Sequence, residues 1–192
     1  MNEARQQTSI GHNSIRVEIV TTMQQLQHAY AIRAICFMED TGLVAGHAFD
    51  GNDLQATHVI IYSGEEPVGA LRIRWFKDFA KIERSAFRKA YRSPRNLKIA
   101  AEFVFKHIAR KGYNRVITHA SPLYARVWRT LLGFKQVADK PPAFYAGHDE
   151  PFVELIKELD VPENAITLAT PPAVLFRTEG EWDYASKYEV SR

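Results

Sequence analysis

Three β-rich runs follow one another closely in the middle of the chain. Residues 57–63 (THVIIYS) and 68–76 (VGALRIRWF) are joined by GEEP, which is a hairpin signal. Residues 80–87 (AKIERSAF) alternate in polarity directly after them, as a third strand would. Because connections this short join antiparallel neighbours, the three runs predict an antiparallel meander, around which the remaining elements must be arranged.

Helix and strand patterns lie on both sides of this meander. They predict strands at 17–20 and 115–121, helices at 23–41, 97–111 and 123–132, and further strands within FKQV (134–137) and PFVELIKELD (151–160). Gly112 and Gly133 follow the last two helices, as glycines at helix ends commonly do. We therefore expect an α/β (α+β) fold in which helices flank a mixed, mainly antiparallel central sheet.

The length of the chain allows one hydrophobic core of good size, since 192 residues contain 46% hydrophobic side chains. We expect a single domain over residues 16–160. Residues 1–15 (MNEARQQTSIGHNSI) lack an apolar run and are expected to form a disordered leader. Residues 161–192, which include Pro171 and Pro172, are expected to form a C-terminal appendage packed on the core.

The charge and the cysteine content narrow the class of protein. A net charge of +3 is too small to require nucleic acid as a partner. Cys36 is the one cysteine, so no disulfide framework is possible and a cytoplasmic location is expected. No apolar run approaches the length of a membrane span. The seven histidines show no metal-ligand spacing and no phosphate-binding glycine motif occurs, so we expect no metal and no bound nucleotide.

The start of the helix at 97–111 carries the signals of an anion site. Ser93 can cap the first backbone amides, and Pro94 suits the first helical position. Free amides and the helix dipole attract anions, and no acidic residue lies between Arg84 and Ala101. The cations at this end are Arg88, Lys89, Arg92, Arg95 and Lys98. The alternative is an ordinary solvated basic loop, because runs of charge are usually surface.

The sequence also resembles known acyltransferases. The order of elements, together with HASPLYARVWRTLLGFKQV (119–137), resembles the GCN5-related N-acetyltransferase (GNAT) fold, whose last core helix runs into a Leu-Gly-Phe turn and a strand. A closer resemblance, over residues 17–160, is to the acyl-homoserine-lactone (autoinducer) synthases and the long-chain N-acyl amino acid synthases. It is carried by Arg33, Phe37, Asp50, Asp53, Gly69, Arg72, Glu83 and Ser85, and by the tail FYAGHDEPFVELIKELD.

Some positions depart from these families. Ala86 stands where an arginine commonly follows the serine, and the tryptophan expected after the first helix of the lactone synthases is absent, which argues against lactone formation. RSPRN (92–96) stands where acetyltransferases of this fold usually carry a glycine-rich loop. We interpret it as a pantetheine-phosphate site that uses helix amides and side-chain charge. Its predicted residues are Arg88, Arg92, Arg95, Asn96 and Lys98.

The resemblance implies an N-acyltransferase that moves an acyl group from acyl-CoA or an acyl carrier protein to the amine of a small acceptor, such as an amino acid. Acyl-CoA or acyl-phosphopantetheine would be a co-substrate, with no permanently bound cofactor. The alternative is a catalytically silent module that binds acyl thioesters on the same scaffold. Nucleic-acid binding by the basic run is the weakest hypothesis, because only Phe87 and Tyr91 place aromatic side chains within it.

Glu83 is the predicted general base, because acyl transfer to an ammonium needs a proton acceptor and related acetyltransferases commonly place a glutamate on this strand. Alternation puts one set of side chains on its face, Lys81, Glu83, Ser85 and Phe87, and another set opposite, Ile82, Arg84 and Ala86. The alternative for Glu83 is a structural ion pair with Arg72 or Arg74. By resemblance, Tyr124 is assigned to protonate the leaving thiolate, although aromatic residues spaced as Tyr124 and Trp128 are more often core.

Further residues are predicted to bind the acceptor. Asp50 and Asp53 could hold its amine, although the sequence FDGND would also form an Asx turn. Arg72 could grip an acceptor carboxylate with two hydrogen bonds, or form a cross-strand salt bridge instead. The resemblance adds Arg33 and Ser85 to the substrate-binding residues.

Overall fold

The computed structural model describes residues 14–145, 149–186 and 189. The predicted leader therefore lies outside the described residues, apart from Ser14 and Ile15, and Ile15 already begins the first strand. None of the helices in the described part of the chain is both long and apolar enough to cross a membrane.

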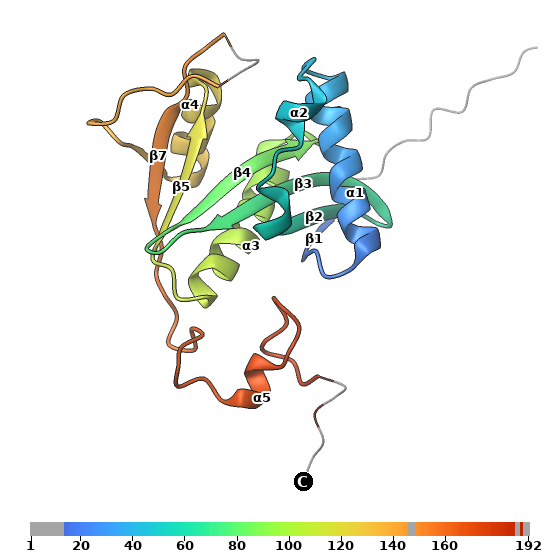
Figure 1. Ribbon diagram of the computed structural model, residues 1–192, viewed down its shortest axis with the longest axis vertical. Helices are drawn as coiled ribbons and strands as arrows, with labels where there is room; N and C mark the ends of the chain where they lie inside the picture. The colour runs from blue at the N-terminus through green and yellow to red at the C-terminus, as the bar shows by residue number, and fades with distance from the viewer. Residues whose placement is uncertain (1–13, 146–148, 187–188, 190–192) are drawn as a thin grey trace, which may run out of the picture.

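Seven strands form one sheet in the order β1-β2-β3-β4-β5-β7-β6. Their bounds are β1 Ile15–Ile19, β2 Thr57–Ser63, β3 Glu66–Trp75, β4 Ala80–Phe87, β5 Arg115–Ala120, β6 Lys135–Gln136 and β7 Val153–Glu158. All neighbouring strands are antiparallel except β4 and β5, which are parallel. The predicted meander is confirmed as β2, β3 and β4, and the predicted fold class is confirmed with it (Figure 1).

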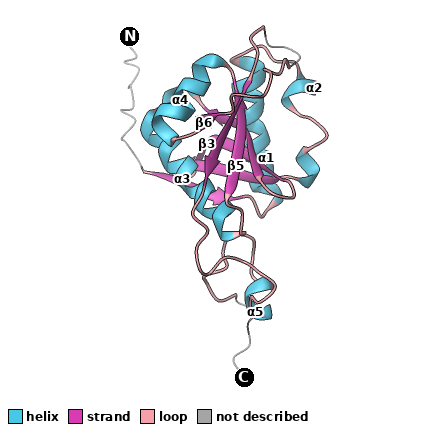
Figure 2. Cartoon of the chain, turned by 90° about the vertical axis from the view of Figure 1, so that its left-hand side faces the viewer, coloured by secondary structure: helices cyan, strands magenta, loops and turns pink. Residues whose placement is uncertain are grey.

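Helices cover both faces of this sheet (Figure 2). The helical segments are α1 Met23–Arg33, the π-helical turn η1 Ala34–Glu39, α2 Ala45–Ala48, the 3₁₀ turns η2 Asp53–Gln55 and η3 Lys89–Tyr91, α3 Pro94–Arg110, α4 Pro122–Leu132 and α5 Pro172–Leu175. The predicted helix at 23–41 is thus an α-helix that widens into a π-helical turn before Gly42. Helices α3 and α4 pack on one face, and α1 and α2 lie over the other.

Local sequence signals start and stop these helices. Thr22 and Gln25 form a capping box at α1, with each side chain accepting from the other residue's backbone amide at 3.2 Å. The hydroxyl of Ser93 accepts from the amide of Asn96 at 3.1 Å, so Ser93 caps α3 as predicted. Gly133 ends α4 with φ of +73°, a backbone conformation that glycine adopts without strain.

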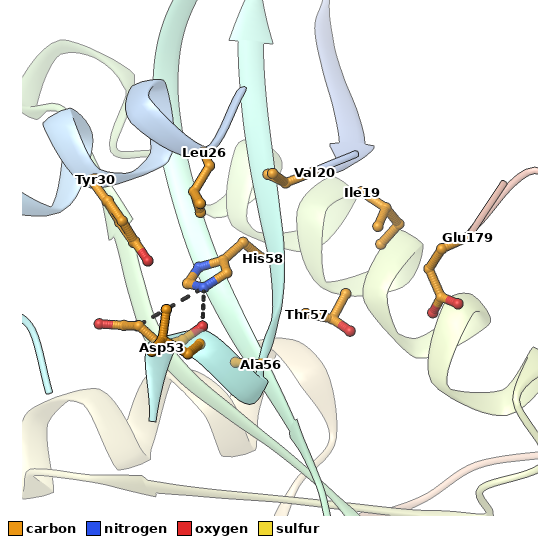
Figure 3. A pocket seen from close by; sticks show the side chains of 10 residues that line it. Ile19, Val20, Leu26, Tyr30, Asp53, Ala56, Thr57, His58 and Glu179 are labelled. Carbon is orange, nitrogen blue, oxygen red and sulfur yellow. Dashed lines mark hydrogen bonds and ion pairs between the residues drawn. The ribbon is translucent and has the colours of Figure 1, made fainter. Parts of the chain in front are cut away.

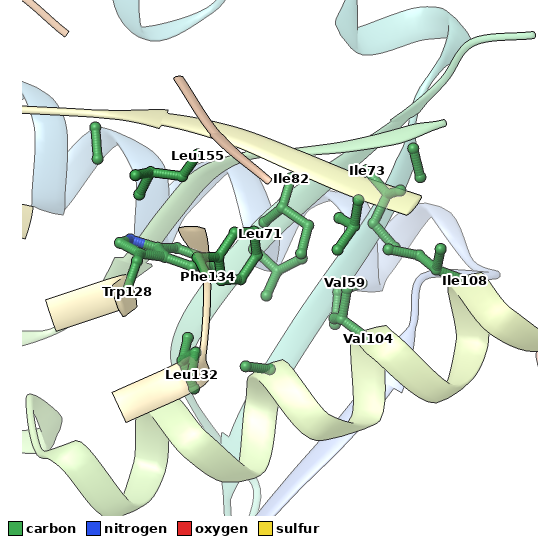
Figure 4. Packing of buried hydrophobic residues seen from close by; sticks show 14 of the residues in the cluster. Val59, Leu71, Ile73, Ile82, Val104, Ile108, Trp128, Leu132, Phe134 and Leu155 are labelled. Carbon is green, nitrogen blue, oxygen red and sulfur yellow. The ribbon is translucent and has the colours of Figure 1, made fainter. Parts of the chain in front are cut away.

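The main hydrophobic core lies between the sheet and helices α3 and α4. It includes Val104 and Ile108 of α3, Trp128 and Leu132 of α4, and Leu155 of β7 (Figure 4). A smaller core lies on the other face, where Ala29, Ile32 and Cys36 pack against the sheet. Cys36 is buried there as a packing residue.

Strand β4 departs from the predicted alternation at Arg84. The pairing of β3 with β4 shifts register between Ala70 and Arg72, and Arg84 has φ of +53°, which marks a β-bulge. Ile82 packs on the α3 side, whereas beyond the bulge Ala86 joins the α1-side core and Phe87 packs with Ala100 of α3. The predicted grouping of Phe87 with Glu83, and of Ala86 with Ile82, is therefore wrong, because the extra residue reverses the faces.

The C-terminal segment contacts the end of α3. Trp182 is buried and stacks on His107, with ring centroids 5.3 Å apart. The ammonium of Lys111 donates to Glu179 at 2.8 Å, and Arg110 donates to Asp183 at 2.9 Å. Figure 1 shows this segment below the sheet, with α5 near its lower end.

Candidate functional site

A buried set of charged side chains lies on the α1 face of the sheet. We call Arg33, Asp50, Asp53, Arg72 and Glu83 the charged cluster; all five were predicted to be site residues, and the structure brings them together. Helix α1 supplies Arg33, the segment before β2 supplies the two aspartates, and the paired residues Arg72 and Glu83 come from β3 and β4. The face of a sheet that lies under helices is normally apolar. Because an unpaired buried charge is costly, each of these side chains needs a partner of opposite charge.

Arg72 lies at the centre of the cluster and is 2% exposed. Its Nη1 donates to Asp50 at 2.7 Å and to Asp53 at 2.8 Å. Its Nη2 donates to Asp50 at 3.0 Å and also to Glu83, and its Nε donates to Glu83 at 3.1 Å. A guanidinium has five N–H donors, and these contacts use them all. The salt-bridge alternative for Arg72 is thus the one present, and no donor is left for an acceptor carboxylate.

Asp53 joins the cluster to helix α1. Its carboxylate accepts from Arg33 at 2.6 Å and 3.1 Å, and Arg33 is 1% exposed. Its backbone carbonyl lies 2.9 Å from Nε2 of His58, a buried residue on β2. Burial would raise the pKa of Asp53, but the hydrogen bonds from Arg33 and Arg72 outweigh burial and lower it. Asp53 is therefore an ionised carboxylate that is paired with both Arg33 and Arg72.

Asp50 forms both the predicted turn and part of the cluster. Its Oδ1 accepts from the amide of Asn52 at 2.9 Å, which is an Asx turn. Its Oδ2 also accepts from Arg84 at 3.1 Å, so the bulge residue of β4 is tied to the loop before β2. Hydrogen bonds from Arg72 hold the pKa of Asp50 well below its usual range.

Both carboxylate oxygens of Glu83 are engaged by cations. Oε2 accepts from Arg72, and Oε1 lies 2.6 Å from the ammonium of Lys81 and 3.7 Å from Arg74. Burial would raise the pKa of Glu83, but the hydrogen bond from Lys81 and the pairing with Arg72 outweigh burial and lower it. The ion-pair alternative for Glu83 is thus present, and a lowered pKa makes a carboxylate a weaker base near neutral pH.

The sheet opens between β4 and β5, next to the charged cluster. The two strands pair only at Ala80 with Val116 and at Lys81 with Ile117. Beyond these pairs they separate toward the top of Figure 1, and the hydroxyl of Thr118 donates to the carbonyl of Ile82 at 2.9 Å. The opening leaves strand edges whose backbone groups can bind an extended ligand between them.

His119 faces this opening and was not among the predicted site residues. Continuing the parallel pairing of Lys81 with Ile117 by two residues sets His119 of β5 across the opening from Glu83 of β4. His119 is also paired with Glu154 of β7. The predicted strand at 115–121 includes this histidine. Which residue His119 faces depends on the order and register of the strands, and the sequence does not supply these.

The start of α3 is less free than the sequence suggested. Asp40 accepts from Arg92 and lies 3.0 Å from Lys89, and Glu66 accepts from Arg88. The side chain of Asn96 donates to the carbonyl of Tyr91 at 2.9 Å. Acidic residues distant in sequence thus neutralise part of the predicted phosphate site.

The remaining groups at this end of α3 are still available to a ligand. Pro94 has no amide hydrogen, and the amides of Asn96 and Leu97 bond to Ser93, so the amide of Arg95 is the one left at the first turn. The side chain of Arg95 is exposed. Lys98 lies 3.8 Å from Glu102 and is more than half exposed.

Two further predicted residues differ from the cluster in their surroundings. Tyr124 is 62% exposed at the start of α4, whereas Trp128 is buried, so the two aromatic rings do not share an environment. No hydrogen bond within the described part of the chain joins Tyr124 to the charged cluster. Ser85 follows the bulge, and its hydroxyl is buried without a hydrogen-bond partner among the described residues.

A cavity of about 260 Å³ lies beside the cluster, between α1, β2 and the C-terminal segment. Figure 3 shows His58 and Asp53 at its base, with Leu26 and Tyr30 above them and Glu179 at the far end. The described residues contain no group of histidine, cysteine and acidic side chains that could hold a metal ion.

No protein-family model matches the sequence. The sequence is similar to that of the uncharacterized N-acetyltransferase YjcF of Bacillus subtilis. The two are 28% identical over 129 residues, which are 65% of this chain and 92% of the relative. Its name agrees with the predicted class of enzyme.

Three solved structures show the same fold. A Lactobacillus plantarum protein named as an N-acetyltransferase has a TM-score of 0.69 and 24% identity, over 77% of this chain and 99% of that one. FeeM, an N-acyl amino acid synthase from uncultured soil microbes, has a TM-score of 0.60 and 17% identity, over 78% and 92%. An aminoglycoside 6'-N-acetyltransferase complexed with coenzyme A has a TM-score of 0.58 and 13% identity, over 74% and 96%. This chain therefore has the fold of these acyltransferases, and the relative that it resembles in sequence carries the name of an N-acetyltransferase.

Proposed function

We propose that the protein is an N-acyltransferase that transfers an acyl group from an acyl thioester to the amine of a small acceptor. The observation that carries this proposal is the opening between β4 and β5, which begins after two backbone pairs. The strand edges there offer backbone donors and acceptors to the amide groups of a pantetheine chain. A coenzyme A complex is known for a protein of the same fold, which supports acyl-CoA as the donor.

The donor phosphates are proposed to bind at the start of α3, which directly follows β4 and η3. Arg95 and Lys98 are exposed there, and Arg88 and Arg92 can exchange their carboxylate partners for phosphate oxygens. Phosphate oxygens accept the same charge-assisted hydrogen bonds as carboxylates. An acyl carrier protein, whose phosphopantetheine presents the same chemistry, is the second donor to test.

The acceptor is proposed to carry a carboxylate, as an amino acid does. The three carboxylates of the cluster are surrounded by five cationic side chains, Arg33, Arg72, Arg74, Lys81 and Arg84. The excess of positive charge attracts an anionic group and disfavours a polycation. The fold shared with an N-acyl amino acid synthase supports the same acceptor class.

The direct test is an assay of free thiol released from acyl-CoA of different chain lengths in the presence of amino acids and other amines, followed by mass spectrometry of the product. The proposal expects thiol and amide in equal amounts. Tight binding of acyl-CoA without any thiol release would favour the catalytically silent module instead. A chain that neither binds nor turns over any acyl thioester would contradict both.

Asp40→Asn is expected to strengthen CoA binding. The substitution removes the carboxylate that holds Arg92 and Lys89, so both cations become available to phosphate. Because exposed ion pairs are weak, the expected gain in affinity is about two- to fivefold. Titration calorimetry at low salt measures it.

Asp78→Asn is the matched control, since it makes the same change in charge at an exposed site before β4, at the opposite end of that strand from α3. It should leave CoA affinity within the error of the measurement. Equal affinities for wild type and Asp40→Asn would show that phosphate does not compete with Asp40, and would move the proposed phosphate site away from Arg92.

A further inference from the structure

Ionisable side chains form a continuous row across five neighbouring strands on the α1 face of the sheet. Backbone pairing sets His58 beside Arg72, Arg72 beside Glu83, and His119 beside Glu154. Glu83 of β4 and His119 of β5 each lie two residues beyond the last backbone pair of these strands, Lys81 with Ile117. They are therefore neighbours in the row, on the two sides of the opening. His119 and Glu83 are therefore the two titratable groups of the row that flank the proposed path of the thioester.

The partners of His119 define which nitrogen can accept a proton. Its Nε2 lies 3.3 Å from Oε2 of Glu154, and Oε1 of Glu154 accepts from Lys140. A carboxylate at Nε2 favours the tautomer that carries its proton on Nε2. The other nitrogen, Nδ1, has no hydrogen-bond partner among the residues that the structure describes. His119 thus has a carboxylate beside one ring nitrogen, while its other nitrogen is buried and has no hydrogen-bond partner within the described part of the chain.

The charges around His119 favour its neutral form. Burial and the positive charge of Lys81 lower the pKa of His119, while the negative charges of Glu154 and Glu83 raise it by less. Lys140 also lowers the pKa, and the ring of Tyr145 packs edge-on at 6.3 Å. A neutral imidazole near pH 7 is a competent base, whereas Glu83 is fully paired with cations.

We propose that His119 is the general base of the acyl transfer, and that Glu83 acts as a positioning residue that fixes Arg72 and Lys81 beside it. This rests on the proposed function. His119 Nδ1 takes one proton from the acceptor ammonium, and the neutral amine attacks the thioester carbonyl. The C–N bond forms, the C–S bond breaks, and the second amine proton passes to the leaving thiolate, giving amide and free thiol. The imidazolium then returns its proton to water.

The test compares His119→Gln, Glu83→Gln and wild type with one donor and one amine acceptor over pH 4.5 to 8. His119→Gln is expected to lower kcat/KM by about 10²-fold or more, with unchanged CoA affinity and unchanged melting temperature. Because an imidazole is a base only when neutral and the pKa of His119 is lowered, the ratio of wild type to His119→Gln should be constant at neutral pH and should fall only at a pH below the ordinary imidazole pKa of about 6.5. Taking the ratio cancels the titration of the amine, which is common to both proteins.

His28→Gln is the control, since His28 lies on α1 and its Nδ1 contacts the hydroxyl of Tyr62, away from the opening. It should keep the wild-type rate and pH profile. A kcat/KM of His119→Gln within threefold of wild type would overturn the proposal. So would a pH dependence that appears in the ratio of wild type to Glu83→Gln and is absent from the ratio of wild type to His119→Gln.

A ring-nitrogen NMR titration of His119 in the full chain tests the proposal without turnover. The expected state at pH 7 is a neutral ring with its proton on Nε2; a charged ring or a proton on Nδ1 would overturn the proposal. Failure of wild type to react with any donor and acceptor pair would instead count against the proposed function, so the two failures are distinguishable.

Discussion

Arg72→Ala should lower the free energy of unfolding by about 3–5 kcal/mol, the usual cost of removing one partner from a buried ion pair. Arg72 is 2% exposed and donates to Asp50, Asp53 and Glu83 at once. Its removal would leave three carboxylates crowded together in a site that water reaches poorly. Urea unfolding at pH 7, followed by circular dichroism, measures the difference.

Arg74→Ala is the matched control for this substitution. Arg74 lies two residues along the same strand, but its side chain is 29% exposed and its contact with Glu83 is 3.7 Å long. The expected loss is below about 1 kcal/mol, as for exposed ion pairs. Similar losses in the free energy of unfolding for the two variants would mean that the charged cluster does not hold α1 and the segment before β2 onto the sheet.

The cluster also predicts how stability depends on pH. The pKa values of Asp50, Asp53 and Glu83 are lowered in the folded protein. A carboxyl with a lowered pKa contributes stability that is present above its unfolded pKa of about 4 and is lost as pH falls through the folded pKa. The free energy of unfolding of wild type should therefore decrease from about pH 5 downward, and Arg72→Ala should show a shallower decrease.

Trp182→Ala is expected to lower the free energy of unfolding by about 3 kcal/mol, as removal of a buried tryptophan side chain typically does. Trp182 is 8% exposed and stacks on His107, and neighbouring ion pairs tie the same segment to α3. The prediction assumes that residues 161–186 unfold together with the core, as an appendage packed on it would. Thermal unfolding with and without the substitution tests this.

Tyr184→Ala is the control, since Tyr184 is 76% exposed in the same segment, and it should change stability by less than about 0.5 kcal/mol. A loss that is equally small for Trp182→Ala would show that the segment opens independently of the core. In that case the C-terminal residues would be an attached segment rather than part of the folding unit.

The elements that rest on local signals could be predicted from the sequence. The strands Thr57–Ser63 and Ala80–Phe87 have the predicted bounds, because local patterns define them without reference to the rest of the chain: β-branched residues in the first and alternating polarity in the second. The cap at Ser93 is equally local, since it needs only a hydroxyl and the amide three residues later.

Features that depend on distant partners could not be predicted in the same way. The bulge at Arg84 is accompanied by ties from its side chain to Asp50 and to the carbonyl of His47, which come from a different part of the chain. The basic run from Arg84 to Lys98 contains no acid in sequence, yet Asp40 and Glu66 reach it through the fold. Charge patterns along a chain therefore describe a surface only after its folded neighbours are known.

The candidate site shows the same division. The residue types and the resemblance pointed to Arg33, Asp50, Asp53, Arg72 and Glu83, and these do lie together. Their pairing with one another, rather than with a substrate, depends on distances that only the structure provides. His119 requires the parallel register of β4 and β5, which no local signal encodes.

We expect the opening between β4 and β5 to receive the acyl thioester. A crystal structure of the full chain with a non-hydrolysable thioether analogue of acyl-CoA tests it most directly. We expect the pantetheine to lie between β4 and β5, the phosphates at the start of α3, and the acyl carbonyl between Glu83 and His119. An analogue bound elsewhere, with β4 and β5 still paired only at Ala80 and Lys81 and nothing between them, would show that the opening is not the thioester site.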